Sequence, residues 1–118
     1  MTIILRGTYF VQPGKWDNVV ALIGEYRMIC ERLGIPHITF YRRVHSEDGS
    51  PTHILQAEWR FDTWQERVAW GEFVETNRDT LSFTLKLNQL LTERPHYENI
   101  ELLHSADRPF KRTGTYHL

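Results

Sequence analysis

Residues 3–34 read IILRGTYFVQPGKWDNVVALIGEYRMICERLG. From Ile3 to Val11 apolar and polar residues alternate, which is typical of a half-buried strand. From Trp16 to Leu33 apolar residues recur every three or four positions, which predicts a helix, and Gly34 is suited to end it. Pro13-Gly14 separates the two elements. The chain is therefore expected to open with a strand and a helix.

Two more strands are expected after this helix. Residues 37–44 and 52–61 are rich in β-branched and aromatic residues, and residues 46–51 between them are rich in turn formers. These segments predict a hairpin. The second strand of the hairpin is apolar on one side and polar on the other. The apolar side carries Leu55, Ala57, Trp59 and Phe61, and the polar side carries Gln56, Glu58 and Arg60.

The second half of the chain predicts helical structure followed by a last strand. Thr63 and Glu66 form a capping-box pattern, so a helix should begin near Trp64, with Val68 and Trp70 facing inward. Residues 75–94 fit both a strand alternation and a helical stripe, and we predict a helix. Pro95 should end it.

Residues 97–103 are expected to form the last strand, with Ile100 and Leu102 inward. The element order is then βαββαβ, which predicts an α+β, ferredoxin-like fold with a four-stranded antiparallel sheet in the order 4-1-3-2. The domain is expected to span residues 1–104, with residues 105–118 as a C-terminal arm.

Composition limits the classes of function. The 118 residues are 41% hydrophobic and 25% charged, which suits one globular domain. The formal net charge is −1 and the longest basic run is Arg42-Arg43, so nucleic-acid binding is not expected. Cys30 is a single cysteine, and the N-terminal apolar run is too short for a signal peptide or membrane span. We expect a cytoplasmic protein with no membrane partner.

Four segments resemble a known superfamily: Leu5-Arg6-Gly7-Thr8-Tyr9, Pro13-Gly14-Lys15-Trp16, Leu33-Gly34-Ile35 and Leu55-Gln56-Ala57-Glu58-Trp59-Arg60-Phe61. In this order they resemble the dimeric α/β-barrel superfamily over about residues 3–103. The NIPSNAP-like branch is the most similar, and the antibiotic-biosynthesis-monooxygenase-like branch is next.

The resemblance implies a ferredoxin-like protomer whose sheet packs on that of a second protomer, with a pocket between each sheet and its own helices. Members of the superfamily include cofactor-independent oxygenases and isomerases as well as proteins without known activity. The resemblance transfers no catalytic residue, metal or cofactor to this chain.

Aromatic residues gather on the predicted helix-facing side of the sheet. Aromatic walls with a few polar groups are typical of small-molecule sites. Four of these residues are expected to contact a substrate: Tyr9, Phe40, Trp59 and Trp70. The alternative, which the sequence leaves open, is that these rings only form the core.

Two residues are candidates for chemistry in that pocket. His53 lies on the same side as Leu55 and has the pKa range of an acid or base, and Arg42 offers a rigid donor fork for a carboxylate or enolate oxygen. The alternatives are a histidine half in solvent and an arginine that extends off the sheet edge. The six histidines show no metal-ligand spacing, so neither a metal nor another cofactor is expected.

The polar side of the sheet is expected to pair with a second copy of the chain. Its members are Arg6, Thr8, Thr39, Tyr41, Arg43, Gln56, Glu58, Arg60, Asn99 and Glu101, with Phe10 and Ile54 as further apolar contributors. The expected function is binding, extending to cofactor-independent oxygenation or isomerisation, of an aromatic or polyketide-like molecule. The alternative is a non-enzymatic homo-oligomeric association module.

Overall fold

The computed structural model describes residues 1–35 and 38–103, so the expected arm at residues 105–118 lies outside the described residues. The strands and helices are, in chain order, β1 (Thr2–Phe10), α1 (Trp16–Leu33), β2 (Thr39–His45), β3 (Pro51–Phe61), α2 (Trp64–Thr76), α3 (Arg78–Asn88) and β4 (His96–Leu102). The predicted α+β, ferredoxin-like fold is confirmed.

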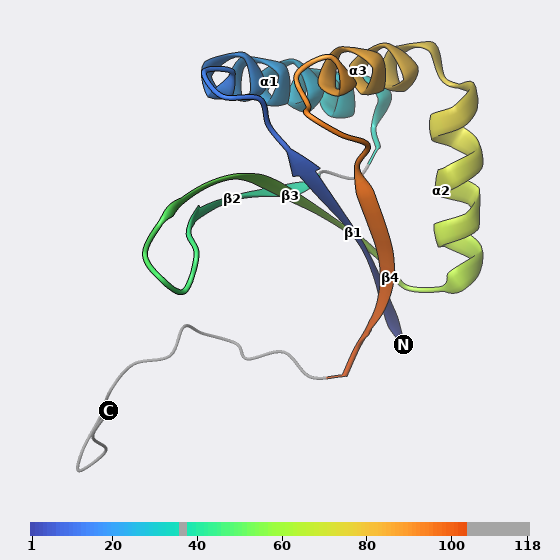
Figure 1. Ribbon diagram of the computed structural model, residues 1–118. Helices are drawn as coiled ribbons and strands as arrows, with labels where there is room; N and C mark the ends of the chain where they lie inside the picture. Colours follow the sequence, from blue (N-terminus) through green and yellow to red (C-terminus); the bar gives the residue numbers. More distant parts are fainter. Residues whose placement is uncertain (36–37, 104–118) are drawn as a thin grey trace, which may run out of the picture.

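The four strands form one antiparallel sheet in the order β2-β3-β1-β4, as predicted. Helices α1 and α3 lie side by side over one face of the sheet, and α2 stands beside its other end (Figure 1). The register sets the rows of side chains under these helices. Leu5 lies between Trp59 and Asn99, and Gly7 lies between Ala57 and Tyr97.

Helix α1 has the predicted bounds and the predicted stop. Gly34 follows it with a φ of 66°, and its N–H bonds the carbonyl of Cys30. A left-handed residue at this position ends a helix without steric cost only when it lacks a Cβ. The buried side of the helix packs over the sheet through Val19, Leu22, Tyr26 and Cys30.

The stretch whose structure was ambiguous in the sequence, residues 75–94, is helical up to Asn88. The prediction that Pro95 ends this helix is wrong, because the chain turns after Asn88 and Leu91 forms a β-bridge with Val11. Thr63 caps α2 by accepting a hydrogen bond from the Glu66 N–H, as the capping-box pattern predicts. Asn77 separates α2 from α3, and its side chain accepts hydrogen bonds from the N–H groups of Asp79 and Thr80. Trp70 is buried as expected. The prediction that Val68 faces inward is wrong, because α2 buries the side that carries Trp70 and Phe73.

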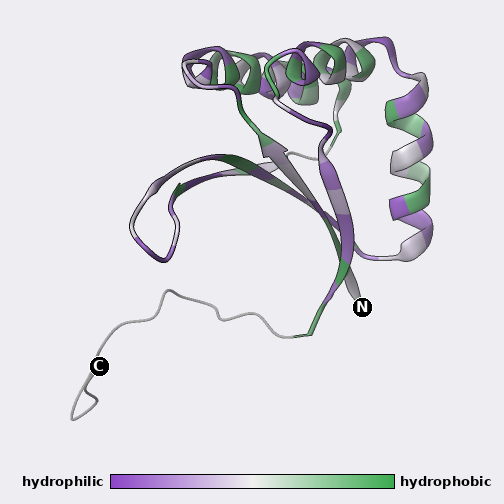
Figure 2. Cartoon of the chain, viewed as in Figure 1, coloured by the Kyte–Doolittle hydropathy of each residue, from purple (hydrophilic) through white to green (hydrophobic). Residues whose placement is uncertain are grey.

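The prediction of which β4 side chains face the helices is also wrong. Ile4 points to the open face of the sheet and pairs with Ile100, so Ile100 and Leu102 lie on the open face rather than inward. Asn99 and Glu101, expected on the open face, lie on the helix-facing side. Figure 2 shows β4 as mainly hydrophilic, with hydrophobic residues near its end. A strand of this composition has a weak alternation of its own, so the pairing with β1 decides which side each residue takes.

Among the helices that the structure describes, none is both long and apolar enough to cross a membrane.

Candidate functional site

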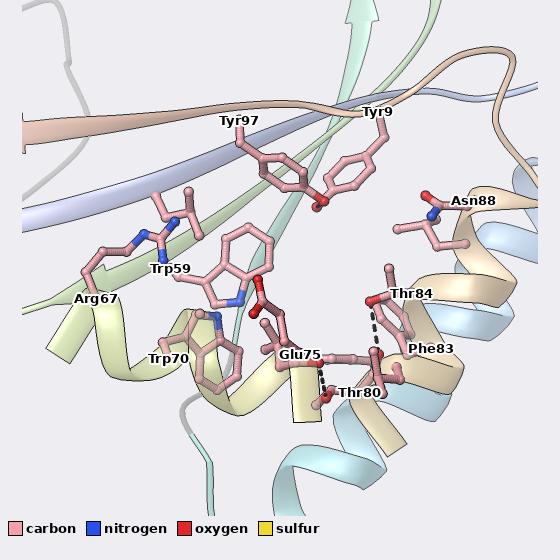
Figure 3. A pocket seen from close by; sticks show the side chains of 16 residues that line it. Tyr9, Trp59, Arg67, Trp70, Glu75, Thr80, Phe83, Thr84, Asn88 and Tyr97 are labelled. Carbon is pink, nitrogen blue, oxygen red and sulfur yellow. Dashed lines mark hydrogen bonds between the residues drawn. The ribbon is translucent and has the colours of Figure 1, made fainter. Parts of the chain in front are cut away.

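A partly open pocket of about 400 Å³ lies between the helix-facing side of the sheet and helices α2 and α3. Its volume is within the range of small-molecule sites. Figure 3 shows its side chains converging from strands and helices. The lining residues are Leu5, Tyr9, Tyr26, Trp59, Arg67, Trp70, Gly71, Val74, Glu75, Thr80, Leu81, Phe83, Thr84, Leu87, Asn88 and Tyr97.

Two tyrosines lie along one side of the pocket, on β1 and β4. The ring of Tyr9 folds back over Gly7, where a Cβ would lie only 2.6 Å from the Tyr9 hydroxyl. In this position the Tyr9 hydroxyl donates to the Tyr97 hydroxyl at 3.3 Å, and the rings meet edge to face. Burial, with a contribution from Tyr97, raises the pKa of Tyr9 well above its usual value. Tyr9 is therefore a protonated donor at neutral pH.

Aromatic rings from helices α1, α2 and α3 and from strand β3 form the walls. The ring of Phe83 from α3 lies 4.3 Å from that of Tyr26, and Trp70 stacks on Phe73 with ring centroids 5.7 Å apart. Trp59 comes from β3. Its indole Nε1 is buried close to the Tyr26 hydroxyl and, like the Trp16 Nε1, makes no well-formed hydrogen bond among residues 1–35 and 38–103. A buried donor without a partner costs about 1–3 kcal/mol.

Helix α2 contributes one polar side to the pocket. Arg67, Gly71 and Glu75 are spaced four residues apart and therefore share one face of the helix. Gly71 is in the helix interior, where glycine costs about 1 kcal/mol relative to alanine. A Cβ there would meet the Arg67 Nη1 at 3.2 Å. The glycine leaves room both for the pocket and for this guanidinium.

A neutral side chain orients the arginine. The Arg67 Nε donates to the Asn99 Oδ1 at 2.8 Å. Of the ion pairs in the described part of the chain, none involves Arg67 or Glu75. The pocket therefore carries an oriented positive charge that no carboxylate of these residues neutralises.

Three of the four expected substrate contacts, Tyr9, Trp59 and Trp70, come together in the pocket. Phe40 does not join them. Its ring lies 6.2 Å from that of Tyr26, and it lines a second hollow of about 380 Å³ beside α1.

The two residues expected to carry chemistry lie outside the pocket lining. The Arg42 guanidinium lies over the Trp16 ring, 4.3 Å from its centroid, at the start of α1. The His53 side chain is exposed, while its backbone carbonyl accepts a hydrogen bond from Val11. Arg42 thus neither enters the pocket nor extends freely off the edge, because the aromatic face of Trp16 holds it.

The described residues give little support for a reactive thiol or for a metal site. Cys30 is buried, and burial raises the pKa of its thiol, which disfavours the reactive thiolate. No group of three or more His, Cys, Asp or Glu side chains among these residues is arranged to hold a metal ion.

The sequence did not place Arg67, Gly71, Glu75 or Tyr97 in the pocket, and it placed the supporting residue Asn99 on the open face of the sheet. One local signal was present, because a glycine inside a helix that begins with a capping box suggests a packing or ligand requirement. The pairing of Arg67 with Asn99 has no local signal, since 32 residues separate them.

No family model matches the sequence, and no curated protein matches it. Solved structures do match. A NIPSNAP family protein from Agrobacterium tumefaciens is 15% identical with a TM-score of 0.65, over 84% of this chain and 83% of that one. A NIPSNAP-like domain protein from Burkholderia xenovorans is 13% identical with a TM-score of 0.67, over 92% and 91%.

A candidate antibiotic biosynthesis monooxygenase from Bordetella bronchiseptica is 15% identical with a TM-score of 0.66, over 87% of this chain and 98% of that one. Identities this low establish shared architecture rather than shared activity. The chain therefore has the fold of the NIPSNAP-like and antibiotic-biosynthesis-monooxygenase-like proteins, as the resemblance in its sequence implied.

Proposed function

We propose that this protein binds a small aromatic organic molecule in the pocket between its sheet and helices α2 and α3. The observation that carries this proposal is the partly open pocket of about 400 Å³, whose walls include the aromatic side chains of Trp59, Trp70 and Phe83. A volume of this size and an apolar lining with a few polar groups are typical of small-molecule sites. The surrounding rings offer stacking surfaces for a planar compound.

The same pocket supports an extension to catalysis. The Tyr9 hydroxyl donates its one proton to the Tyr97 hydroxyl, so the Tyr97 hydroxyl can turn its own proton toward negative charge that develops on a ligand oxygen. The architecture shared with a candidate antibiotic biosynthesis monooxygenase adds support for oxygenation or isomerisation of an aromatic or polyketide-like compound without a cofactor. The cytoplasm remains the location expected from the sequence.

The proposal is tested by ligand binding with a variant that fills the pocket. Purified protein is titrated with a panel of two- and three-ring aromatic compounds while tryptophan fluorescence is recorded. Gly71→Leu places a side chain in the pocket and should abolish the response. Gly24→Leu is the matched control, because a Cβ at Gly24 meets nothing within 4 Å. A response that both variants retain, or no response from the wild-type protein, contradicts the proposal.

We also propose that the open face of the sheet pairs with a second copy of the chain. Supporting observations are its mixture of apolar and charged groups, with Tyr41 46% exposed beside the ion pair of Arg6 and Glu58 at 2.8 Å. A two-fold axis can match such a face to itself.

The rival function is assembly itself, without a ligand. It is favoured by the same open face and predicts that substitution of Arg43 or Glu58 abolishes assembly and function together. Trp59 substitutions would then change only stability.

A further inference from the structure

We infer that the molecule bound in this pocket is an aromatic anion, and that Arg67 determines this specificity. The inference rests on the proposed function and specifies the chemistry of its ligand. The expected class is a planar ring system with a carboxylate, phenolate or enolate oxygen.

The first step is the state of the arginine. Arg67 is partly buried in the pocket wall, and its Nε is engaged by the Asn99 amide oxygen at 2.8 Å. An amide fixes the orientation of a guanidinium without cancelling its charge. The described carboxylates form no ion pair with it. An oriented, uncompensated guanidinium beside an aromatic wall is suited to an oxyanion.

The second step is the width of the sheet surface beside the arginine. Trp59, Leu5 and Asn99 form one row across three neighbouring strands, on the side of the sheet that faces the helices. Neighbouring strands are about 4.8 Å apart, so this row spans about 10 Å. Arg67 reaches the Asn99 end of the row and Trp59 forms the other end. A molecule of two fused rings with an oxygen on Arg67 can therefore extend toward the Trp59 ring.

The third step is the orientation of the ligand. Residues 67 and 75 are about 12 Å apart along α2, given a rise of about 1.5 Å per residue. Glu75 lines the pocket at the far end of this face and repels an anionic group placed near it. The anionic oxygen is therefore directed to the Arg67 end, with the ring system against Trp70 and the gap left by Gly71.

The test compares an anion with a neutral compound of the same shape, 2-naphthoate and 2-naphthamide, by isothermal titration calorimetry. The wild-type protein should prefer the carboxylate, and Arg67→Gln should weaken its binding by about 10- to 100-fold, the effect of one charge-assisted hydrogen bond. The affinity for 2-naphthamide should change by less than about threefold, since a neutral amide makes no hydrogen bond between two charged groups with Arg67. Arg78→Gln makes the same charge change at an exposed position of α3 outside the pocket and should leave both affinities unchanged.

A second variant separates charge from structure. Asn99→Asp keeps the size of the side chain but places a carboxylate against Arg67, so the anion should bind more weakly while amide binding and the melting temperature are retained. If Arg67→Gln and Asn99→Asp leave carboxylate binding unchanged, Arg67 does not select the ligand.

The outcome also distinguishes this inference from the proposed function. Equal binding of both compounds, abolished by Gly71→Leu, would keep the pocket as a small-molecule site and overturn the assignment of an anion. A second outcome leads to the same conclusion: neither 2-naphthoate nor 2-naphthamide binds, but a neutral compound of the wider panel does, and Gly71→Leu blocks its binding. If no compound of the panel or the pair binds, both proposals are contradicted.

Discussion

The hydroxyl groups of Tyr9 and Tyr97 lie 3.3 Å apart and join β1, an inner strand of the sheet, to the edge strand β4. This contact depends on a residue without a side chain. Tyr97 pairs with Gly7 across the sheet, and the Tyr9 ring occupies the space above Gly7. One polar side of the pocket is thus built from a Gly-x-Tyr segment of β1 and one tyrosine of β4.

Gly7→Ala should displace this ring. The added Cβ would lie 2.6 to 2.9 Å from three atoms of Tyr9, which is only 4% exposed and has little room to move. We expect a loss of about 1–3 kcal/mol in the free energy of unfolding, measured by urea denaturation. Gly24→Ala, at an open position of α1, should be neutral or stabilising by up to about 1 kcal/mol. Equal stability of Gly7→Ala and wild type would show that the ring does not occupy this space.

Alkaline pH should destabilise the protein through its buried tyrosines. Burial raises the pKa of Tyr9, so the folded state holds the phenolic proton more tightly than the unfolded state does. The resulting stability is complete below the unfolded pKa of about 10 and is lost as the pH rises above it. Tyr9→Phe should make this decline in unfolding free energy shallower by up to about 1.4 kcal/mol per pH unit. Identical slopes for the two proteins in urea titrations above pH 10 would contradict the assignment.

The junction of α2 and α3 should depend on the side chain of Asn77. It accepts hydrogen bonds from two backbone N–H groups at the start of α3, at 3.0 and 3.1 Å. Asn77→Ala should lower the free energy of unfolding by about 0.5–2 kcal/mol, whereas Asn77→Asp, which keeps the acceptor, should retain most of it. Chemical denaturation of the two variants checks this, and equal losses would argue against a capping role.

Reversal of a charge on the open face should separate the proposed dimer. Arg43 belongs to β2 and pairs with Ile54 of β3 on that face. By light scattering after size exclusion, the wild-type protein should have twice the mass of the 14.1 kDa chain, and Arg43→Glu should have the mass of one chain. Arg78→Glu on α3 is the control of equal charge change. A monomeric wild-type protein, or a dimer that Arg43→Glu leaves intact, contradicts pairing through this face.

The fold was predictable from the sequence because its signals are local. The alternation in β1, the stripe of α1, the stop at Gly34 and the cap at Thr63 each act within a few residues, and the structure has all of them. The sides of β4 were not predictable in this way. Ile100 and Leu102 suggested an inward side, but the register with β1 places them on the open face.

The pocket was predictable only in part. Large aromatic residues on the inner side of a strand can be recognised from the alternation in the sequence. Tyr9 and Trp59 were predicted to line the pocket on this basis. The polar residues depend on the angle between α2 and the sheet, since that angle brings Arg67 to Asn99. No periodicity in the chain encodes such an angle.

The most direct measurement of the central claim is a two-dimensional ¹H–¹⁵N spectrum of the tryptophan indole groups during titration with the tightest aromatic ligand. The chain has four tryptophans, which provide their own controls. Trp59 and Trp70 line the pocket, whereas Trp16 and Trp64 do not. Each resonance is assigned by one Trp→Phe variant.

We predict that the Trp59 and Trp70 indole N–H signals shift as an aromatic ring packs against these side chains, and that those of Trp16 and Trp64 stay in place. In Gly71→Leu none of the four should move. A Trp59 signal that does not respond to a bound ligand, or responds equally in Gly71→Leu, would contradict the assignment of this pocket as the binding site.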